Sequence, residues 1–132
     1  METFDDCPCS GANLSRLLQP AIMTILAGEG LHGYAIVEHL AEMPTLGGNR
    51  PDPTGVYRAL GTMEDRGFVT SGWDTSERGP AKKVYELTPS GLECLARWIF
   101  SLSDYHRAIG ELLAIARRVS VQAAHSDREA AR

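Results

Sequence analysis

Apolar residues between positions 14 and 26 recur every three or four places, which is the spacing of one face of an α-helix. Pro20 interrupts this stripe, so either the helix kinks there, or a short first helix ends and Pro20 opens the next one. Gly28 and Gly30 are expected to end the element, because glycine interrupts regular structure. The residues of the stripe are Leu14, Leu17, Leu18, Ala21, Ile22, Ile25 and Leu26.

A second helix is predicted to open at His32-Gly33-Tyr34 and to stop at Pro44. Gly33 has no side chain and would allow another helix to approach closely. The buried side of this helix should be formed by Ile36, Val37, Leu40 and Met43.

A third helix is predicted to begin at Asp52-Pro53, since Asp is a favourable N-cap and Pro is tolerated at the first helical position. It should end at Gly67, the residue type favoured just past a helix end. The residues that follow the helical period and should face inward are Val56, Leu60 and Met63.

Two strand-like runs follow, at residues 68–74 and 82–87, joined by a loop that contains Arg78-Gly79-Pro80. We expect Trp73 on the first run to be a packed structural residue. A helix followed at once by a basic hairpin is the layout of a winged helix.

A long last helix is predicted after Thr88, a favourable N-cap, and Pro89. Its apolar positions alternate in steps of three and four over more than three heptads, which is a coiled-coil seam. One small domain cannot bury a helix of about 30 residues, roughly 45 Å long. We therefore expect a second copy of the chain to cover part of it. The predicted interface residues are Leu95, Ile99, Leu102, His106, Ile109 and Leu113, with a parallel row at Trp98, Tyr105, Leu112 and Val119.

These patterns predict a mainly α chain with a small β-hairpin, in which a winged helix-turn-helix precedes a long dimerisation helix. The expected divisions are an N-terminal tail at 1–12, a DNA-binding domain at 13–88, a dimerisation helix at 89–121 and a C-terminal tail at 122–132. No run is long and apolar enough for a membrane span, and no signal peptide is evident. We therefore expect a cytoplasmic protein without a membrane partner.

The chain of 132 residues carries a formal net charge of −4, which counts against DNA binding. The distribution of charge matters more, because acidic residues gather in the N-terminal tail while Arg58, Arg78, Lys82 and Lys83 cluster in the winged unit. Non-specific attraction to phosphates should consequently be modest and strongly salt-dependent.

The outer face of the third helix is the candidate DNA reader, since recognition helices contact base edges from their N-terminal half. Arg58 could pair with guanine or a phosphate, and Gly61 would permit close approach. An ordinary surface face with Tyr57 simply packed is the alternative. The candidates are Thr54, Tyr57, Arg58 and Gly61.

Arg78, Lys82 and Lys83 suit a wing that touches the sugar–phosphate backbone or enters the minor groove. The alternative is a solvated hairpin, because charged residues commonly protect an exposed edge strand.

The three cysteines imply no disulfide framework. Cys7 and Cys9 form a C-x-C pair that could bind a soft metal or become oxidised, but no companion pair completes a zinc site. Cys94 with His32 or His39 would contribute only if the tail folded back. No cofactor is expected. Because no catalytic motif is present either, an enzyme is not predicted.

The chain resembles the PadR family of winged-helix transcriptional regulators. The resemblance rests on residues 22–26 followed by 32–36, on 54–60 with 64–69, on 78–88, and on Pro89-Ser90-Gly91 opening a long last helix. It implies a homodimer that binds an inverted-repeat operator and represses transcription. Some members release DNA when a planar or hydrophobic small molecule binds between the subunits.

Within that resemblance, Trp98 could stack on a planar effector, although a core or interface role is the simpler interpretation. His106 in the seam could fix register or make the dimer pH-sensitive, or it could simply hydrogen-bond. Gly61-Thr62 departs from the longer polar or basic residues common in such helices. Base preference must therefore rest mainly on Thr54, Tyr57 and Arg58, on the wing and on DNA shape.

The sequence thus predicts a sequence-specific, ligand-responsive repressor with double-stranded DNA and a second copy of itself as partners. Such a protein would be prokaryotic and associated with the nucleoid when bound to DNA. A winged-helix adaptor that binds proteins is one alternative. A repressor that senses metal or oxidant through Cys7 and Cys9 is the other.

Overall fold

The computed structural model describes residues 17–43, 51–75 and 79–131. The elements follow in the order α1 (Leu18–Gly28), β1 (Leu31–His32), α2 (Gly33–Glu42), α3 (Pro53–Asp65), β2 (Val69–Asp74), β3 (Lys82–Leu87) and α4 (Pro89–Ala130). The chain divides into two compact units between Ala96 and Arg97. The first holds α1–α3, the sheet and the start of α4, and the second is formed by the remainder of α4. The predicted mainly α chain with a small β element and a long last helix is confirmed.

The start of α1 shows how the helix accommodates Pro20. The helix begins at Leu18, so Pro20 lies in its first turn, where a missing N–H costs no helical hydrogen bond. The helix therefore need not kink. Leu14 lies outside the described residues.

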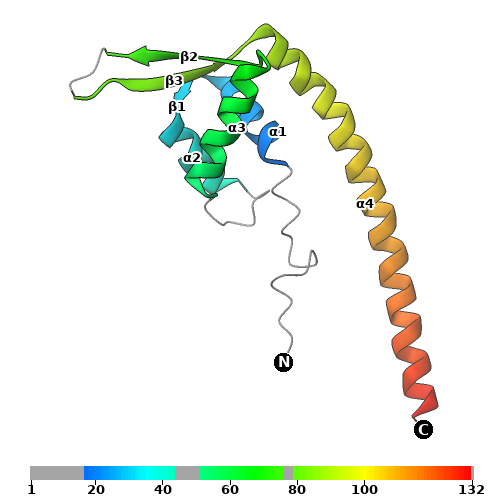
Figure 1. Ribbon diagram of the computed structural model, residues 1–132. Helices are drawn as coiled ribbons and strands as arrows, with labels where there is room; N and C mark the ends of the chain where they lie inside the picture. The colour runs from blue at the N-terminus through cyan, green and yellow to red at the C-terminus, as the bar shows by residue number, and fades with distance from the viewer. Residues whose placement is uncertain (1–16, 44–50, 76–78, 132) are drawn as a thin grey trace. The chain divides into compact units, whose positions relative to one another are not determined.

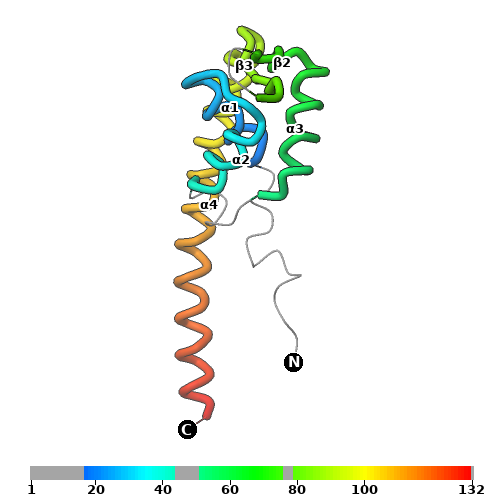
Figure 2. Tube along the Cα trace, turned by 90° about the vertical axis from the view of Figure 1, so that its left-hand side faces the viewer, coloured from blue at the N-terminus to red at the C-terminus, as the bar shows by residue number. Residues whose placement is uncertain are grey.

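The first unit places its helices on one side of a small sheet, from which the β2–β3 hairpin extends past them (Figures 1 and 2). Nine side chains are almost completely buried between the helices and the sheet, and they include every inward position predicted for α3. They are Ile22, Met23, Ile36, Val37, Leu40, Val56, Leu60, Met63 and Val69.

The sheet has three antiparallel strands in the order β1-β3-β2, so the prediction of a hairpin alone was incomplete. The added strand is β1, whose Leu31 and His32 pair with Tyr85 and Val84 of β3. It connects α1 to α2 and hydrogen-bonds the base of the hairpin to those helices.

The start of α4 is anchored in the first unit, as the Thr88-Pro89 signal predicted. Thr88 Oγ1 accepts a 3.0 Å hydrogen bond from Gly91 N and donates a 2.6 Å hydrogen bond to the carbonyl oxygen of Gly67. The backbone N–H of Thr88 donates to Phe68 O at 3.0 Å. The residues just after α3 and the first turn of α4 are therefore tied together.

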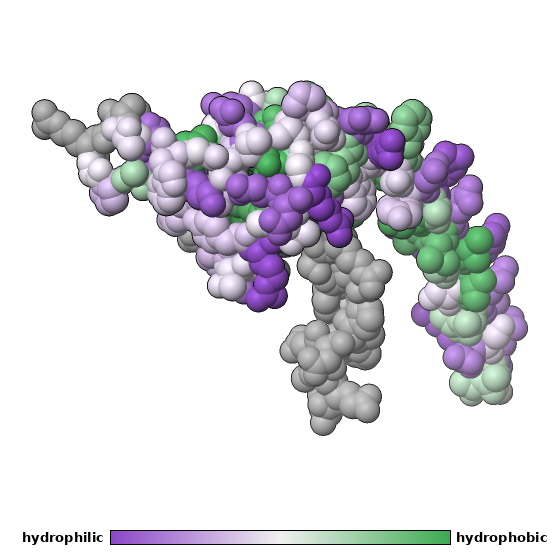
Figure 3. Space-filling view, turned by 45° about the horizontal axis from the view of Figure 1, so that its top comes forward, coloured by the Kyte–Doolittle hydropathy of each residue, from purple (hydrophilic) through white to green (hydrophobic). Residues whose placement is uncertain are grey.

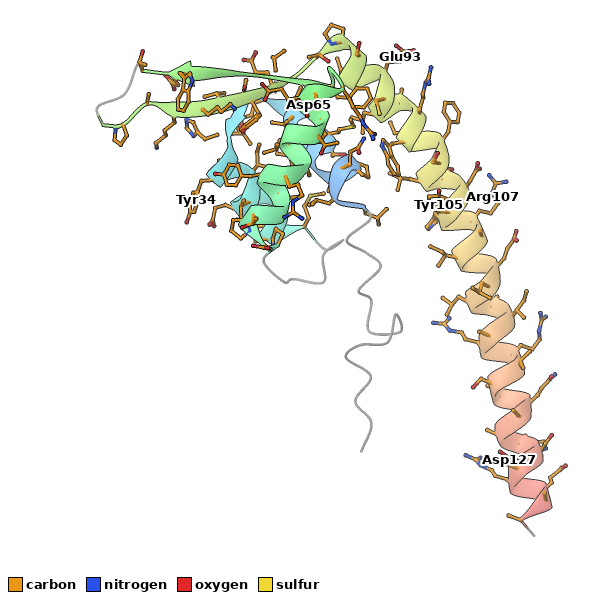
Figure 4. All side chains as sticks on the ribbon, viewed as in Figure 1. Tyr34, Asp65, Glu93, Tyr105, Arg107 and Asp127 are labelled. Carbon is orange, nitrogen blue, oxygen red and sulfur yellow. The ribbon has the colours of Figure 1, made fainter. Side chains whose placement is uncertain are left out.

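The second unit is helical to Ala130, so the predicted end of this helix at residue 121 was too early. Its Ala-rich final turns favour helix strongly enough to continue it. Apolar side chains form a band along the visible face of this helix, next to hydrophilic ones (Figure 3). Tyr105 and Arg107 project from different sides of it (Figure 4).

Candidate nucleic-acid interface

The N-terminal end of α3 is capped as the sequence predicts. Asp52 Oδ1 accepts a 3.2 Å hydrogen bond from Thr54 N, and Asp52 O accepts one of 3.1 Å from Val56 N. At the other end, Gly67 has a φ of 78°, a left-handed conformation that glycine adopts without strain. These two signals explain why the helix has the length it does.

The face of α3 opposite the core is open to solvent. Thr54, Arg58 and Gly61 are all exposed on it. A Cβ built on Gly61 would meet no atom within 4 Å, so the helix presents a flat surface there. Thr62 Oγ1 donates a 3.1 Å hydrogen bond to Arg58 O, which directs that hydroxyl to the helix's own backbone.

Tyr57 is both packed and accessible. Its side chain remains 46% exposed. Its ring lies directly against Gly33 at the start of α2, where an added Cβ would come within 2.8 Å of the Tyr57 hydroxyl oxygen. Gly33 thus provides the close approach that the sequence indicated, and it positions Tyr57 at the edge of the exposed face.

The two lysines of β3 lie on opposite faces of the sheet, because consecutive strand residues alternate. Lys82 is the register partner of Asp74, and Lys83 that of Trp73. Lys83 Nζ lies 4.0 Å from Glu64 Oε2 and 5.6 Å from the centroid of the Tyr85 ring. Since this ion pair is partly exposed, it contributes little stability and leaves Lys83 accessible to another anion.

Both lysines border a hollow of about 380 Å³ where the hairpin meets the starts of α2 and α3. Its other lining residues include Tyr34, which lies on the outer side of α2 (Figure 4). The structure therefore brings Tyr57, Lys82 and Lys83 to one place, although they are far apart in the sequence. Arg78, the other predicted wing cation, lies outside the described residues.

Glu64 is a site residue that the sequence did not reveal. Its Oε1 accepts a 2.7 Å hydrogen bond from Ser71 Oγ of β2, while Oε2 faces Lys83 of β3. Glu64 therefore joins α3 to both strands of the hairpin. The available signal was its position seven residues after Tyr57, on the same helical face.

Trp73 differs from its expected structural role, since 69% of its surface is exposed.

The match to known families decides what kind of protein carries this site. The model of the PadR-like transcriptional regulator family matches residues 22–97, more than half of the chain. The chain belongs to the PadR-like family of transcriptional regulators. No curated protein matches it in sequence.

Solved structures agree with the PadR-like fold. The protein TA0346 from Thermoplasma acidophilum is 28% identical, with a TM-score of 0.67 over 77% of this chain and 95% of that one. A PadR-like transcriptional regulator from Bacillus cereus is 25% identical, with a TM-score of 0.66 over 76% and 94%. Bacillus subtilis PadR, solved in complex with operator DNA, is 26% identical, with a TM-score of 0.56 over 70% and 59%.

Membership of the PadR-like family confirms that the chain is a transcriptional regulator and not an enzyme. Among the described residues, no three or more His, Cys, Asp or Glu side chains gather as a metal site. Cys7 and Cys9 lie outside the described residues. Cys94 Sγ lies 4.0 Å from Gln19 Nε2, within the first unit. No described helix has the length and apolar character needed to cross a membrane.

The predicted dimer positions of this PadR-like chain all lie on α4. Leu95 is half-buried in the first unit, while Ile99, His106, Ile109 and Leu113 are exposed in the second. Leu102 and the predicted effector residue Trp98 are half-buried.

Proposed function

We propose that the chain binds operator DNA as a homodimer and represses transcription in the cytoplasm, associated with the nucleoid. The observation that carries this proposal is the juxtaposition of the flat, exposed face of α3 with a hairpin that bears Lys82 and Lys83. The operator complex of Bacillus subtilis PadR supports it by similarity.

In this proposal α3 enters the major groove with its N-terminal half. Arg58 hydrogen-bonds to guanine or to a phosphate, and Thr54 contacts a base edge or the backbone. Gly61 brings the helix close to the groove floor. The hairpin contacts the sugar–phosphate backbone or the adjacent minor groove through Lys82, Lys83 and Arg78.

The dimer is inferred from the uncovered apolar seam of α4, on which Ile109 is 64% and Leu113 47% exposed. A second copy of the chain carries the same seam and would cover it. Two recognition helices related by a two-fold axis would read an inverted repeat, with half-sites about 34 Å apart. His106 within the seam would fix the register of the two helices.

The proposal also includes control of DNA binding by a small-molecule effector. Trp98 offers an indole face on α4, and a planar or hydrophobic effector that stacks on it between the subunits would release the DNA. An effector titration that displaces DNA from the wild type but not from Trp98→Ala tests this step separately from DNA binding.

A selection from random double-stranded DNA, followed by a mobility-shift assay on the recovered duplex, tests the central proposal. Binding should prefer an inverted repeat over a scrambled duplex and weaken steeply with salt. Arg58→Ala should weaken binding about tenfold and relax sequence preference. Lys82→Ala should weaken all duplexes alike and lower the salt slope by about one for each subunit.

The matched control is Arg118→Ala, since Arg118 is exposed on α4 and belongs to the second unit. It should leave the affinity unchanged. Failure of the wild type to bind any recovered duplex in a salt-sensitive manner contradicts the proposal. The net charge of −4 would then favour the protein-binding adaptor. A repressor that senses metal or oxidant through Cys7 and Cys9 predicts DNA release that a Cys7→Ser, Cys9→Ser variant loses.

A further inference from the structure

The large aromatic side chain of Trp73 is exposed to solvent. Its 69% exposure keeps a large apolar ring solvated on β2, which is an edge strand of the sheet. Burying an aromatic side chain of this size is favourable by about 2–3 kcal/mol, so a protein gains by covering it. Within the described chain, no element covers it.

The face on which Trp73 lies is fixed by the strand register. Ser71, two residues earlier on β2, points to α3 because its hydroxyl bonds Glu64. Residues two apart on a strand share a face, so Trp73 lies on the α3 side of the hairpin. Its partner across the sheet is Lys83, which also faces Glu64. Trp73 and Lys83 are thus neighbours on the side of the hairpin turned towards the recognition helix.

The proposed function, on which this inference rests, defines the position of this side of the hairpin relative to DNA. With α3 in the major groove and the hairpin at the adjacent minor groove, one sugar–phosphate strand separates the two grooves. This strand must cross the angle between α3 and the hairpin. The hollow lined by Tyr57, Lys82 and Lys83 lies where the hairpin meets α3 and the start of α2.

We propose that Trp73 is a DNA-backbone contact of the wing. Its indole ring packs on the apolar face of a deoxyribose in this strand, and its ring N–H donates to a phosphate oxygen. Lys83 across the sheet supplies the charge for a neighbouring phosphate. The contact reads no base directly, so it sets the register of the protein on the duplex and adds affinity for any sequence.

The two tryptophans of the chain, Trp73 and Trp98, allow a direct test. A Trp98→Phe variant leaves Trp73 as the sole indole, and its emission is followed during titration with the duplex recovered by selection. We expect the emission to change with the same midpoint as the mobility shift. Quenching by acrylamide should fall at least about twofold when the duplex is bound, because the ring becomes shielded. The Trp73→Phe protein, which keeps only Trp98, is the matched optical control.

Affinity provides an independent measurement. Trp73→Ala should weaken selected and scrambled duplexes by the same factor, about tenfold, with an unchanged melting temperature, since the exposed ring packs on little else. A normal mobility shift with unaltered Trp73 emission and quenching overturns this inference and leaves the proposed function standing. Complete absence of binding by the wild type removes both.

Discussion

The hydroxyl of Ser71 donates a 2.7 Å hydrogen bond to the carboxylate of Glu64 and so joins β2, the first strand of the hairpin, to α3. Ser71→Ala should lower the free energy of unfolding by about 1 kcal/mol. It should also weaken DNA binding, because the hairpin is held less firmly against α3. Chemical denaturation and mobility shifts measure the two effects.

Thr70→Ala is the control for this change, since Thr70 is exposed on the opposite face of the same strand. Glu64→Gln separates the two contacts of Glu64, because an amide oxygen can still accept from Ser71 while the charge facing Lys83 is lost. If Ser71→Ala leaves both stability and affinity at wild-type values, the hydrogen bond has no role in holding the hairpin.

The ring of Tyr57 packs so closely on Gly33 that it leaves no room for a side chain at position 33. Gly33→Ala should destabilise the fold by about 2 kcal/mol, since its Cβ would overlap the ring. Tyr57→Ala should cost less in the Gly33→Ala background than in the wild type, and a thermal double-mutant cycle measures this coupling. Gly55→Ala is the control, because a Cβ there would meet nothing within 4 Å and should stabilise α3 by up to about 1 kcal/mol. Additive effects of the Gly33 and Tyr57 changes would refute the contact.

Gly91 is buried against Phe68, which lies between α3 and β2, and against Leu87, the last residue of β3. A Cβ at this position would overlap the carbonyl oxygen of Phe68 and come within 2.6 Å of Leu87 Cδ1. Because backbone cannot easily yield, Gly91→Ala should lower the free energy of unfolding by about 2–3 kcal/mol, as seen by calorimetry or denaturation. Gly110→Ala, further along the same helix with open space around it, should instead be stabilising. Equal stability of the two variants would contradict the packing described for Gly91.

Ile109→Glu tests the apolar seam of α4. A charge placed in the proposed desolvated interface has no partner there, so the proposed dimer should dissociate and DNA affinity should fall at least about a hundredfold. Sedimentation velocity gives the oligomeric state. Arg118→Glu introduces the same side chain on another face of the helix and should leave the dimer intact. A dimer that survives Ile109→Glu would move the interface away from this seam.

Helical signals in this chain were readable because they are local. The Asp52 and Thr88 caps and the inward residues Val56, Leu60 and Met63 each follow from neighbouring residues in the sequence. Strand β1 was not predicted, because two residues between glycines show no strand period and become a strand only by pairing with β3.

In the candidate site, too, the features set by neighbouring residues could be predicted, whereas those set by long-range contacts could not. The exposed face of α3 follows from helical periodicity, whereas the contacts of Glu64 with Ser71 and Lys83 depend on how α3 crosses the hairpin. The 69% exposure of Trp73 likewise depends on the tertiary structure around the hairpin. An aromatic residue on a strand is usually expected to be buried, but the tertiary structure leaves the side chain of Trp73 exposed.

The anchoring of Thr88 has a consequence for signalling. Its side chain and backbone hydrogen-bond to Gly67 and Phe68, the two residues that follow the C-cap of α3. From the next residue, α4 continues without a break to Ala130. A rotation of α4 about its own axis, whether caused by an effector or by a change in dimer packing, would therefore pull on the end of α3 through three hydrogen-bonded residues rather than through a flexible linker.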